Sequence, residues 1–214
     1  MSEVAQKNVY KYRGVEGLVY ARVNEDSAEK YEAGPVKPLC PVAEIGKTTE
    51  SDSAADYFDN KAALVINSEG ADEISIVGAG MSLETIADIT GKTFNPNTGA
   101  FVGTPREERY FAIGYKTKDT DGKYRYVWRF KGTFGIPEDS NITENDSTDT
   151  TGTELTFTGV FTTHVFAKGG WDGTKEVPAP AKDLIVSDRE DKADLTTFFD
   201  TVTTPDDLKA KTAS

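Results

Sequence analysis

The feature that most constrains the fold of this chain is a stretch in which aromatic side chains occupy every second position. The stretch reads Tyr124, Arg125, Tyr126, Val127, Trp128, Arg129, Phe130. Successive side chains of a β-strand point to opposite faces of its sheet, so this period of two predicts a strand with one aromatic face. At this spacing, aromatic rings are more often a core or a subunit interface than a ligand platform.

Two further stretches belong with the aromatic strand. Residues 109–116 are rich in aromatic and β-branched side chains, and the Asp-Thr-Asp-Gly sequence at 119–122 carries the Asp-Gly pair typical of tight hairpin turns. Residues 109–131 are therefore predicted to form an antiparallel hairpin. Residues 154–161 alternate Leu, Phe and Gly with threonine or other small residues, which predicts a half-buried strand of the same sheet.

One helix is predicted over about residues 83–90. Ser82 can cap its first turn, and Gly91 stands where a left-handed residue ends many helices. The predicted apolar stripe consists of Leu83, Ile86, Ala87 and Thr90. Two turns do not persist alone, so the stripe is expected to dock on a sheet.

The rest of the chain divides at a proline-rich connector. Residues 1–176 are predicted to form the β domain, with further strands at 10–13, 18–24, 42–49, 57–67 and 73–77. Within it, an exposed arm is expected at about 25–50 and an exposed loop at 137–152, which holds only one large aliphatic side chain. Residues 177–214 are predicted to be an acidic C-terminal arm, hinged at Pro178 and Pro180, with a short amphipathic segment. That segment contains Leu195, Phe198, Phe199 and Val202.

These patterns together favour a mainly β fold with two packed antiparallel sheets, a sandwich or barrel, and one short flanking helix. The 214 residues can bury a core without disulfides. A composition that includes 19 glycines and 9 prolines rules out a coiled coil.

The residues that usually carry chemistry are sparse. His164 is the only histidine and Cys40 the only cysteine, which excludes disulfides within the chain and every multi-cysteine metal site. We expect His164 to be an ordinary strand-end residue and Cys40 a small apolar filler, because no cation lies beside it. No catalytic, cofactor-binding or metal residue is predicted, and the chain is not expected to be an enzyme.

Two glycine-containing turns resemble ligand-binding motifs only in part. Residues 119–122 do not belong to a complete calcium loop, because placing Gly122 at the sixth loop position puts Trp128 where the loop needs a glutamate. Gly78-Ala79-Gly80 precedes the predicted helix, but Leu83 fills the third glycine position and no lysine follows. Both are expected to be structural turns.

The net charge excludes a further class of function. Acidic residues outnumber basic ones by 36 to 24, which gives a formal charge of −12 and disfavours tight binding of nucleic acid. The N-terminus has no secretion-signal pattern and the longest apolar run is Ala62 to Ile66, so no membrane anchor is expected.

Several of these stretches occur in an order that resembles the phi13-type major tail protein family of long-tailed bacteriophages with non-contractile tails. The likeness covers about residues 8–172. It is most specific in the two strands of the predicted hairpin, above all in the Lys-Tyr-Arg-Tyr-Val-Trp sequence that begins at Lys123. The blocks that carry it are residues 57–60, 82–94, 110–115, 122–134 and 155–159.

The resemblance implies a tail tube subunit located in the virion tail and assembled in the cytoplasm of the host bacterium. Six copies would form a ring whose inner strands close into a barrel, and rings would stack into a tube. Partners implied by the family are other copies of the chain, a tape-measure protein, a tail terminator and distal tail or baseplate proteins. Genomic DNA would pass through the tube without specific binding, since an acidic lumen repels phosphates.

Two placements extend this interpretation. The segment from about Asn24 to Glu50 is expected to reach the next ring as an arm. Arg125 and Arg129 are expected on ring-contact or outer faces, which leaves the lumen acidic. The alternative function is a carbohydrate-binding or adhesive β-sandwich, in which the aromatic side chains of Tyr124, Tyr126, Trp128 and Trp171 form a sugar platform.

Overall fold

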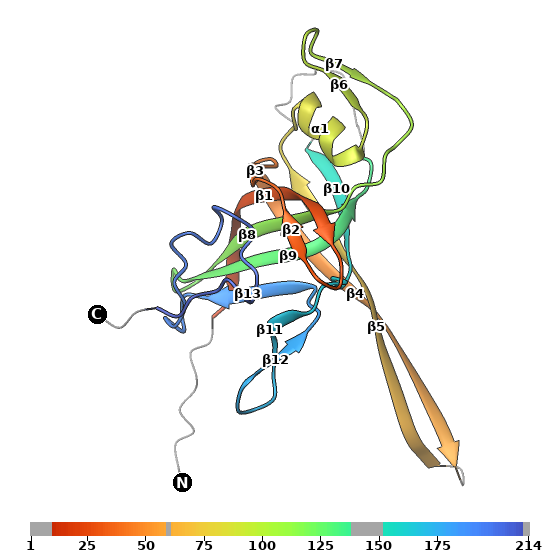
Figure 1. The fold of residues 1–214 in the computed structure, drawn as a ribbon, viewed down its shortest axis with the longest axis vertical. Helices are drawn as coiled ribbons and strands as arrows, with labels where there is room; N and C mark the ends of the chain where they lie inside the picture. Colours follow the sequence, from red (N-terminus) through yellow and green to blue (C-terminus); the bar gives the residue numbers. More distant parts are fainter. Residues whose placement is uncertain (1–9, 59–60, 138–151, 212–214) are drawn as a thin grey trace, which may run out of the picture.

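The fold is a mainly β architecture with one α-helix, as the sequence predicts (Figure 1). The computed structural model describes residues 10–58, 61–137 and 152–211. The expected loop at 137–152 lies almost wholly outside them. The described elements are β1 (Tyr12–Asp26), β2 (Tyr31–Ala33), β3 (Lys37–Pro38), β4 (Val42–Phe58), β5 (Lys61–Gly78), α1 (Leu83–Thr90), β6 (Thr93–Asn95), β7 (Ala100–Val102), β8 (Phe111–Asp119), β9 (Tyr124–Phe134), β10 (Thr153–Gly159), β11 (Phe166–Trp171), β12 (Glu176–Ala179) and β13 (Asp183–Ser187).

The main sheet is one continuous antiparallel sheet whose two parts form two layers. Its strand order is β2-β1-β8-β9-β10-β5-β4, and β3 and β13 pair with β1 and β9. The layers join where β9 meets β10 over the short register from Phe134↔Phe157 to Gly132↔Gly159. A Cβ on Gly132 would lie 2.4 Å from both the Phe157 ring and the Thr158 carbonyl oxygen, so glycine permits the close approach at this corner.

The predicted hairpin forms β8 and β9, and it lies at the centre of the fold. Gly122, at φ 82°, turns the chain between the two strands. One face of the pair packs on the inward side chains of β5 and β10, in a core that includes Ile74, Phe134 and Phe157. The other face is covered as well, so the hairpin is buried on both sides.

The second face is covered by the C-terminal part of the chain. Trp128 and Phe198 are almost fully buried together, and the Trp128 Nε1–H donates to the Phe198 carbonyl oxygen at 2.9 Å. All of β13 is also paired with β9 in the same sheet, from Asp183↔Arg129 to Ser187↔Arg125. Residues 181–211 are therefore packed into the body of the fold, and residues 177–179 pair with β11, where the sequence suggested an arm of residues 177–214 hinged on prolines. The aromatic face of β9 needs a cover, and this segment supplies it.

The helix forms where expected, although its buried stripe differs. The Ser82 hydroxyl accepts a hydrogen bond from the Thr85 backbone N–H, and Gly91 ends the helix at φ 65°. Leu83 is half exposed, whereas Ile89, which the predicted stripe omitted, is 1% exposed and joins the core. The helix thus docks by its C-terminal half, because its first turn lies beyond the edge of the apolar core.

The expected arm at 25–50 is not an arm. β2 and β3 fold back and pair with β1 of the same chain, and Leu39 is buried in the core between the layers. The strand predicted at 57–67 is also different, because Phe58 ends one strand, Lys61 begins the next, and residues 59–60 lie outside the described part. Residues 42–58 and 61–78 instead form a long two-stranded antiparallel ribbon, β4–β5, which projects from the body (Figure 1).

The role of the C-terminal segment can be tested with Phe198→Ala in a Trp171→Phe background. The sequence has two tryptophans, so Trp128 is the one that remains in this background. Removing a ring that is 2% exposed should lower the free energy of unfolding by about 3–5 kcal/mol. Urea unfolding followed by Trp128 emission measures the loss. Phe161→Ala, at a side chain that is 46% exposed, is the control and should cost about 1 kcal/mol or less. Equal stabilities of the two variants would contradict a core role for Phe198.

Candidate assembly interface

The most distinctive surface of the molecule is the outer half of the β4–β5 ribbon. The strand β10 pairs with β5 only from Asp72 to Gly78, whereas β4 and β5 stay paired out to Phe58 and Lys61. Beyond Asp72, no other described strand pairs with the ribbon. A two-stranded hairpin without a covering layer is marginally stable in water, so this ribbon has backbone edges and faces that a partner can cover.

A buried carboxylate lies at the root of the ribbon. Asp72 is 1% exposed and accepts a hydrogen bond from the Thr49 hydroxyl at 2.9 Å. Its other partners are three cations: Lys47 Nζ at 3.0 Å, Arg129 Nη1 at 3.4 Å and Lys182 Nζ at 3.4 Å. Going outward along the ribbon, Asp72 is the last residue of β5 that pairs with β10. Its carboxylate therefore connects the root of the ribbon to Arg129 on β9 and to Lys182, the residue before β13.

The cations of this cluster are balanced by two more acids. Arg129 also pairs with Asp183, and Lys182 Nζ contacts Glu69 Oε1 at 2.6 Å and the Gly70 carbonyl oxygen at 2.5 Å. Arg129 is 4% exposed, so the expectation that it lies on an outer or ring-contact face is wrong. It is held inside the subunit by carboxylates that the strand pattern alone did not reveal. The network ties the root of the ribbon to β9 and to the residue before β13.

The electrostatics of Asp72 favour its charged form. Burial by itself raises the pKa of this carboxyl group, but hydrogen bonds from Lys47 and Thr49 and the charges of Lys47 and Lys182 outweigh burial. The pKa of Asp72 consequently lies below its ordinary value of 3.8. The Asp72 carboxyl group is thus charged throughout the neutral range.

A sequence signal for this cluster was available. Ile74 and Ile76 point into the core, and Asp72 has the same parity on β5. A charged residue on the inward face of a strand requires a buried partner, although the sequence does not identify which distant cation supplies it.

The residues singled out for chemistry lie apart from one another. The His164 backbone N–H donates to Asp26 Oδ1 at 2.9 Å, and its ring meets Phe166 edge to face. Cys40 is partly buried beside Gly78, and burial raises the pKa of its thiol, which disfavours the nucleophilic thiolate. Neither side chain has the partners of a catalytic group among the described residues.

The two glycine-containing turns have structural surroundings. Arg189 Nη2 contacts Asp119 Oδ2 at 2.6 Å and Asp121 Oδ2 at 2.8 Å, so a guanidinium group occupies the acidic turn. The Gly78–Gly80 turn links β5 to the helix cap. Within the described ranges, no cluster of three or more His, Cys, Asp or Glu side chains is arranged to hold a metal ion.

The proposed sugar platform is not assembled as one surface. Trp128 is 0% exposed, while Trp171, at 65% exposed, lies on the separate β11–β12 ribbon. Tyr124 and Tyr126 are partly covered, and Tyr126 stacks on Phe199. The aromatic row of β9 is chiefly an internal face.

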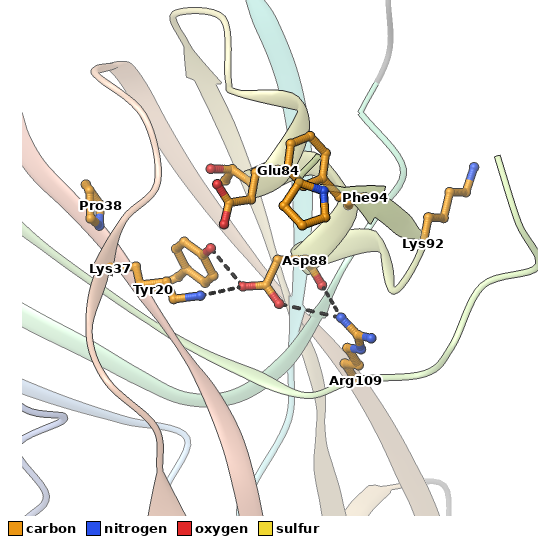
Figure 2. Close-up of a pocket in the computed structure, with 11 residues that line it drawn as sticks. Tyr20, Lys37, Pro38, Glu84, Asp88, Lys92, Phe94 and Arg109 are labelled. Atoms are coloured by element: carbon orange, nitrogen blue, oxygen red, sulfur yellow. Dashed lines mark hydrogen bonds and ion pairs between the residues drawn. The ribbon is translucent and has the colours of Figure 1, made fainter. Parts of the chain in front are cut away.

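A large cleft lies beside α1 and has a volume of about 530 Å³. Figure 2 shows its charged side: Asp88 accepts a hydrogen bond from the Tyr20 hydroxyl at 3.0 Å and pairs with Lys37 and Arg109 at 3.1 and 3.5 Å. Burial and the neighbouring carboxylate of Asp88 raise the pKa of Tyr20, so its hydroxyl stays a donor at neutral pH. We call this space the α1 cleft; its apolar lining residues include Pro38, Phe94 and Pro96.

No protein-family model matches the chain, and no curated protein matches it. Among the described residues, no helix has the length and apolar character needed to span a membrane.

The buried cluster predicts a large effect for Asp72→Asn. The change removes the charge that Lys47, Arg129 and Lys182 share, and should lower the free energy of unfolding by about 3–5 kcal/mol, measured by urea denaturation at neutral pH. Asp52→Asn is the matched control, because Asp52 is exposed on the same ribbon and its carboxylate accepts a hydrogen bond from the adjacent Ser53 N–H. A loss below about 1 kcal/mol for Asp72→Asn would show that the cluster does not hold the ribbon root.

The same variant should change the acid sensitivity of the fold. Because the pKa of Asp72 is lowered in the folded chain, its stabilisation is complete above the unfolded value near 3.8 and is lost as the pH falls through the folded value. Unfolding free energies measured from about pH 6 down to about pH 2.5 should fall less steeply for Asp72→Asn than for the wild type. Parallel curves would contradict this assignment.

Proposed function

We propose that this chain is the major tail tube subunit of a long, non-contractile-tailed bacteriophage, which assembles as hexameric rings that stack into a conduit for DNA. The observation that carries the proposal is the β4–β5 ribbon, whose outer half has no covering layer within the described chain. Its exposed backbone edges suit pairing with another copy, and ring closure would remove such edges.

The resemblance to the tail protein family supports the same function. Its most specific blocks, residues 110–115 and 122–134, form the central β8–β9 hairpin of a mainly β fold. A hairpin buried on both faces provides a rigid body from which a ribbon can project. Such an arrangement suits a structural subunit.

The charge of the chain suits a conduit for DNA. Each copy carries a formal charge of −12, so a ring concentrates negative charge and repels phosphates along its path. In this proposal, the DNA passes without specific binding, and the lasting partners are other copies, a tape-measure protein, a tail terminator and distal tail or baseplate proteins. The protein would reside in the virion tail after assembly in the host cytoplasm.

Negative-stain electron microscopy of concentrated protein tests the proposal directly. Hollow tubes or six-fold rings are the expected result. Sedimentation velocity over a concentration series should show the same assembly in solution. A chain that stays monomeric at every concentration and is also missing from labelled virion tails would refute the proposal.

Shortening the ribbon should abolish this assembly while preserving the fold. Replacing residues 53–67 by Asn-Gly joins the paired residues Asp52 and Ser68 through a two-residue turn and leaves the Asp72 cluster intact. Circular dichroism and urea unfolding should match the wild type, while rings and tubes should be absent by microscopy.

The control keeps the full ribbon length but introduces the same dipeptide. Asp59→Asn with Asn60→Gly places Asn-Gly at the connection between β4 and β5, and this variant should assemble. Tubes from the shortened chain would exclude the outer ribbon as the assembly element.

A further inference from the structure

The β11–β12 ribbon presents a single exposed indole. Trp171 is 65% exposed and lies opposite Glu176 in the antiparallel register. Opposed residues of an antiparallel pair share one face, so the indole and the carboxylate stand side by side. Tryptophan is the residue type most enriched at the energetic centres of protein interfaces, which makes this exposed ring a candidate contact. We call residues 166–179 the Trp171 finger.

The finger is held rigidly at its base and at its tip. At the base, Phe166 is buried, and the Asp206 carboxylate accepts hydrogen bonds from the Ala167 and Lys168 backbone N–H groups at 3.1 and 2.8 Å. At the tip, Asp172 Oδ1 accepts from the backbone N–H groups of residues 174 and 175 at 2.8 and 2.9 Å. A preorganised contact loses little conformational entropy on binding.

The α1 cleft has the complementary chemistry. Its lining includes Pro38 and, apart from it on the helix side (Figure 2), Phe94; proline and aromatic surfaces suit a flat indole ring. The Glu84 carboxylate also lies in the cleft, and it takes no part in the hydrogen bonds and ion pairs drawn around Asp88 (Figure 2). It can therefore accept a hydrogen bond from the indole N–H. Lys92 has the ring of Phe101 as its neighbour and no carboxylate of the described residues within ion-pair distance. Its charge therefore complements that of Glu176.

The finger cannot fill the cleft of its own chain. Figure 1 places α1, with β6 and β7, at one end of the body, and β11 and β12 on the opposite side of the main sheet. The occupant that matches the cleft is accordingly the same finger on a second copy. A contact between two different surfaces of identical chains is heterologous, so it continues from copy to copy.

We propose that Trp171 of one copy inserts into the α1 cleft of the next copy, with Glu176 paired to Lys92. The contact itself is inferred from the structures of the Trp171 finger and the α1 cleft. Its assignment to the junction between stacked rings rests on the proposed tail tube function.

Site-directed cross-linking tests the contact. In a Cys40→Ala background, chains carrying Lys175→Cys at the finger tip are mixed with chains carrying Lys37→Cys at the cleft rim, and a short bis-maleimide is added at concentrations up to those used for microscopy. Heterodimers should form in clear excess over a control mixture in which Glu154→Cys, an exposed site outside the cleft, replaces Lys37→Cys. Equal yields in the two mixtures would overturn the proposal.

Substitutions test the chemistry of the contact. Trp171→Ala should weaken self-association by about 30-fold in sedimentation experiments, the size expected for loss of a tryptophan hot spot. Phe161→Ala removes a similarly exposed ring and should leave association unchanged. Lys92→Glu and Glu176→Lys should each weaken association, and the doubly substituted chain should recover it. Failure of recovery, with folding intact, would overturn the Glu176–Lys92 pair.

The outcomes separate this proposal from the tail tube function. Tubes without the specific cross-link would remove the finger contact and leave the tail tube function standing. The cross-link with open chains of subunits but no rings would retain the contact and remove the tail tube assignment. Absence of the cross-link and of tubes, in a chain that is also missing from labelled virion tails, would refute both.

Discussion

The structure depends on a hairpin that must be covered on both faces. β8 and β9 carry large apolar side chains in both directions, so a single second layer cannot shield them from water. The chain meets this requirement from two sides. β5, β10 and α1 cover one face and the segment around Phe198 covers the other, while β13 extends the sheet by pairing with β9. The C-terminal residues are therefore a necessary part of the fold.

Covering both faces creates an electrostatic requirement at the corner of the sheet. Arg129 stands on β9 between two apolar clusters, and a buried guanidinium without a partner would be strongly destabilising. Asp72 on β5 and Asp183 on β13, the strand paired with β9, supply its counter-charges. The ion cluster consequently links the two layers and fixes the root of the ribbon. A surface placement of Arg129 would have left both carboxylates without this shared partner.

Local patterns predicted the elements better than their arrangement. The structure confirms the hairpin, the strand predicted at 154–161 and the capped helix. Period-two alternation and an Asp-Gly turn indicated the hairpin and the strand. The capping residues Ser82 and Gly91 indicated the helix. The fate of residues 25–41 could not be predicted in this way, because short strands such as β2 and β3 are defined by pairing with β1 and not by their own periodicity. The same holds for the C-terminal segment. Its apolar residues indicated that it packs, whereas the site of packing is set by the distant Trp128.

The candidate surfaces were the hardest to predict, because exposure depends on the whole fold. Trp128 and Trp171 were alike in the sequence as members of an aromatic platform, yet one is buried and the other stands on a projecting ribbon. The distinction matters for assembly in an acidic protein. Copies with a formal charge of −12 repel one another, so their association must rest on short-range contacts that outweigh this repulsion. Backbone pairing along the ribbon and burial of an exposed indole both act at short range. In the proposed tail tube, a subunit that polymerises through such elements would keep the negative charge that suits a conduit for DNA.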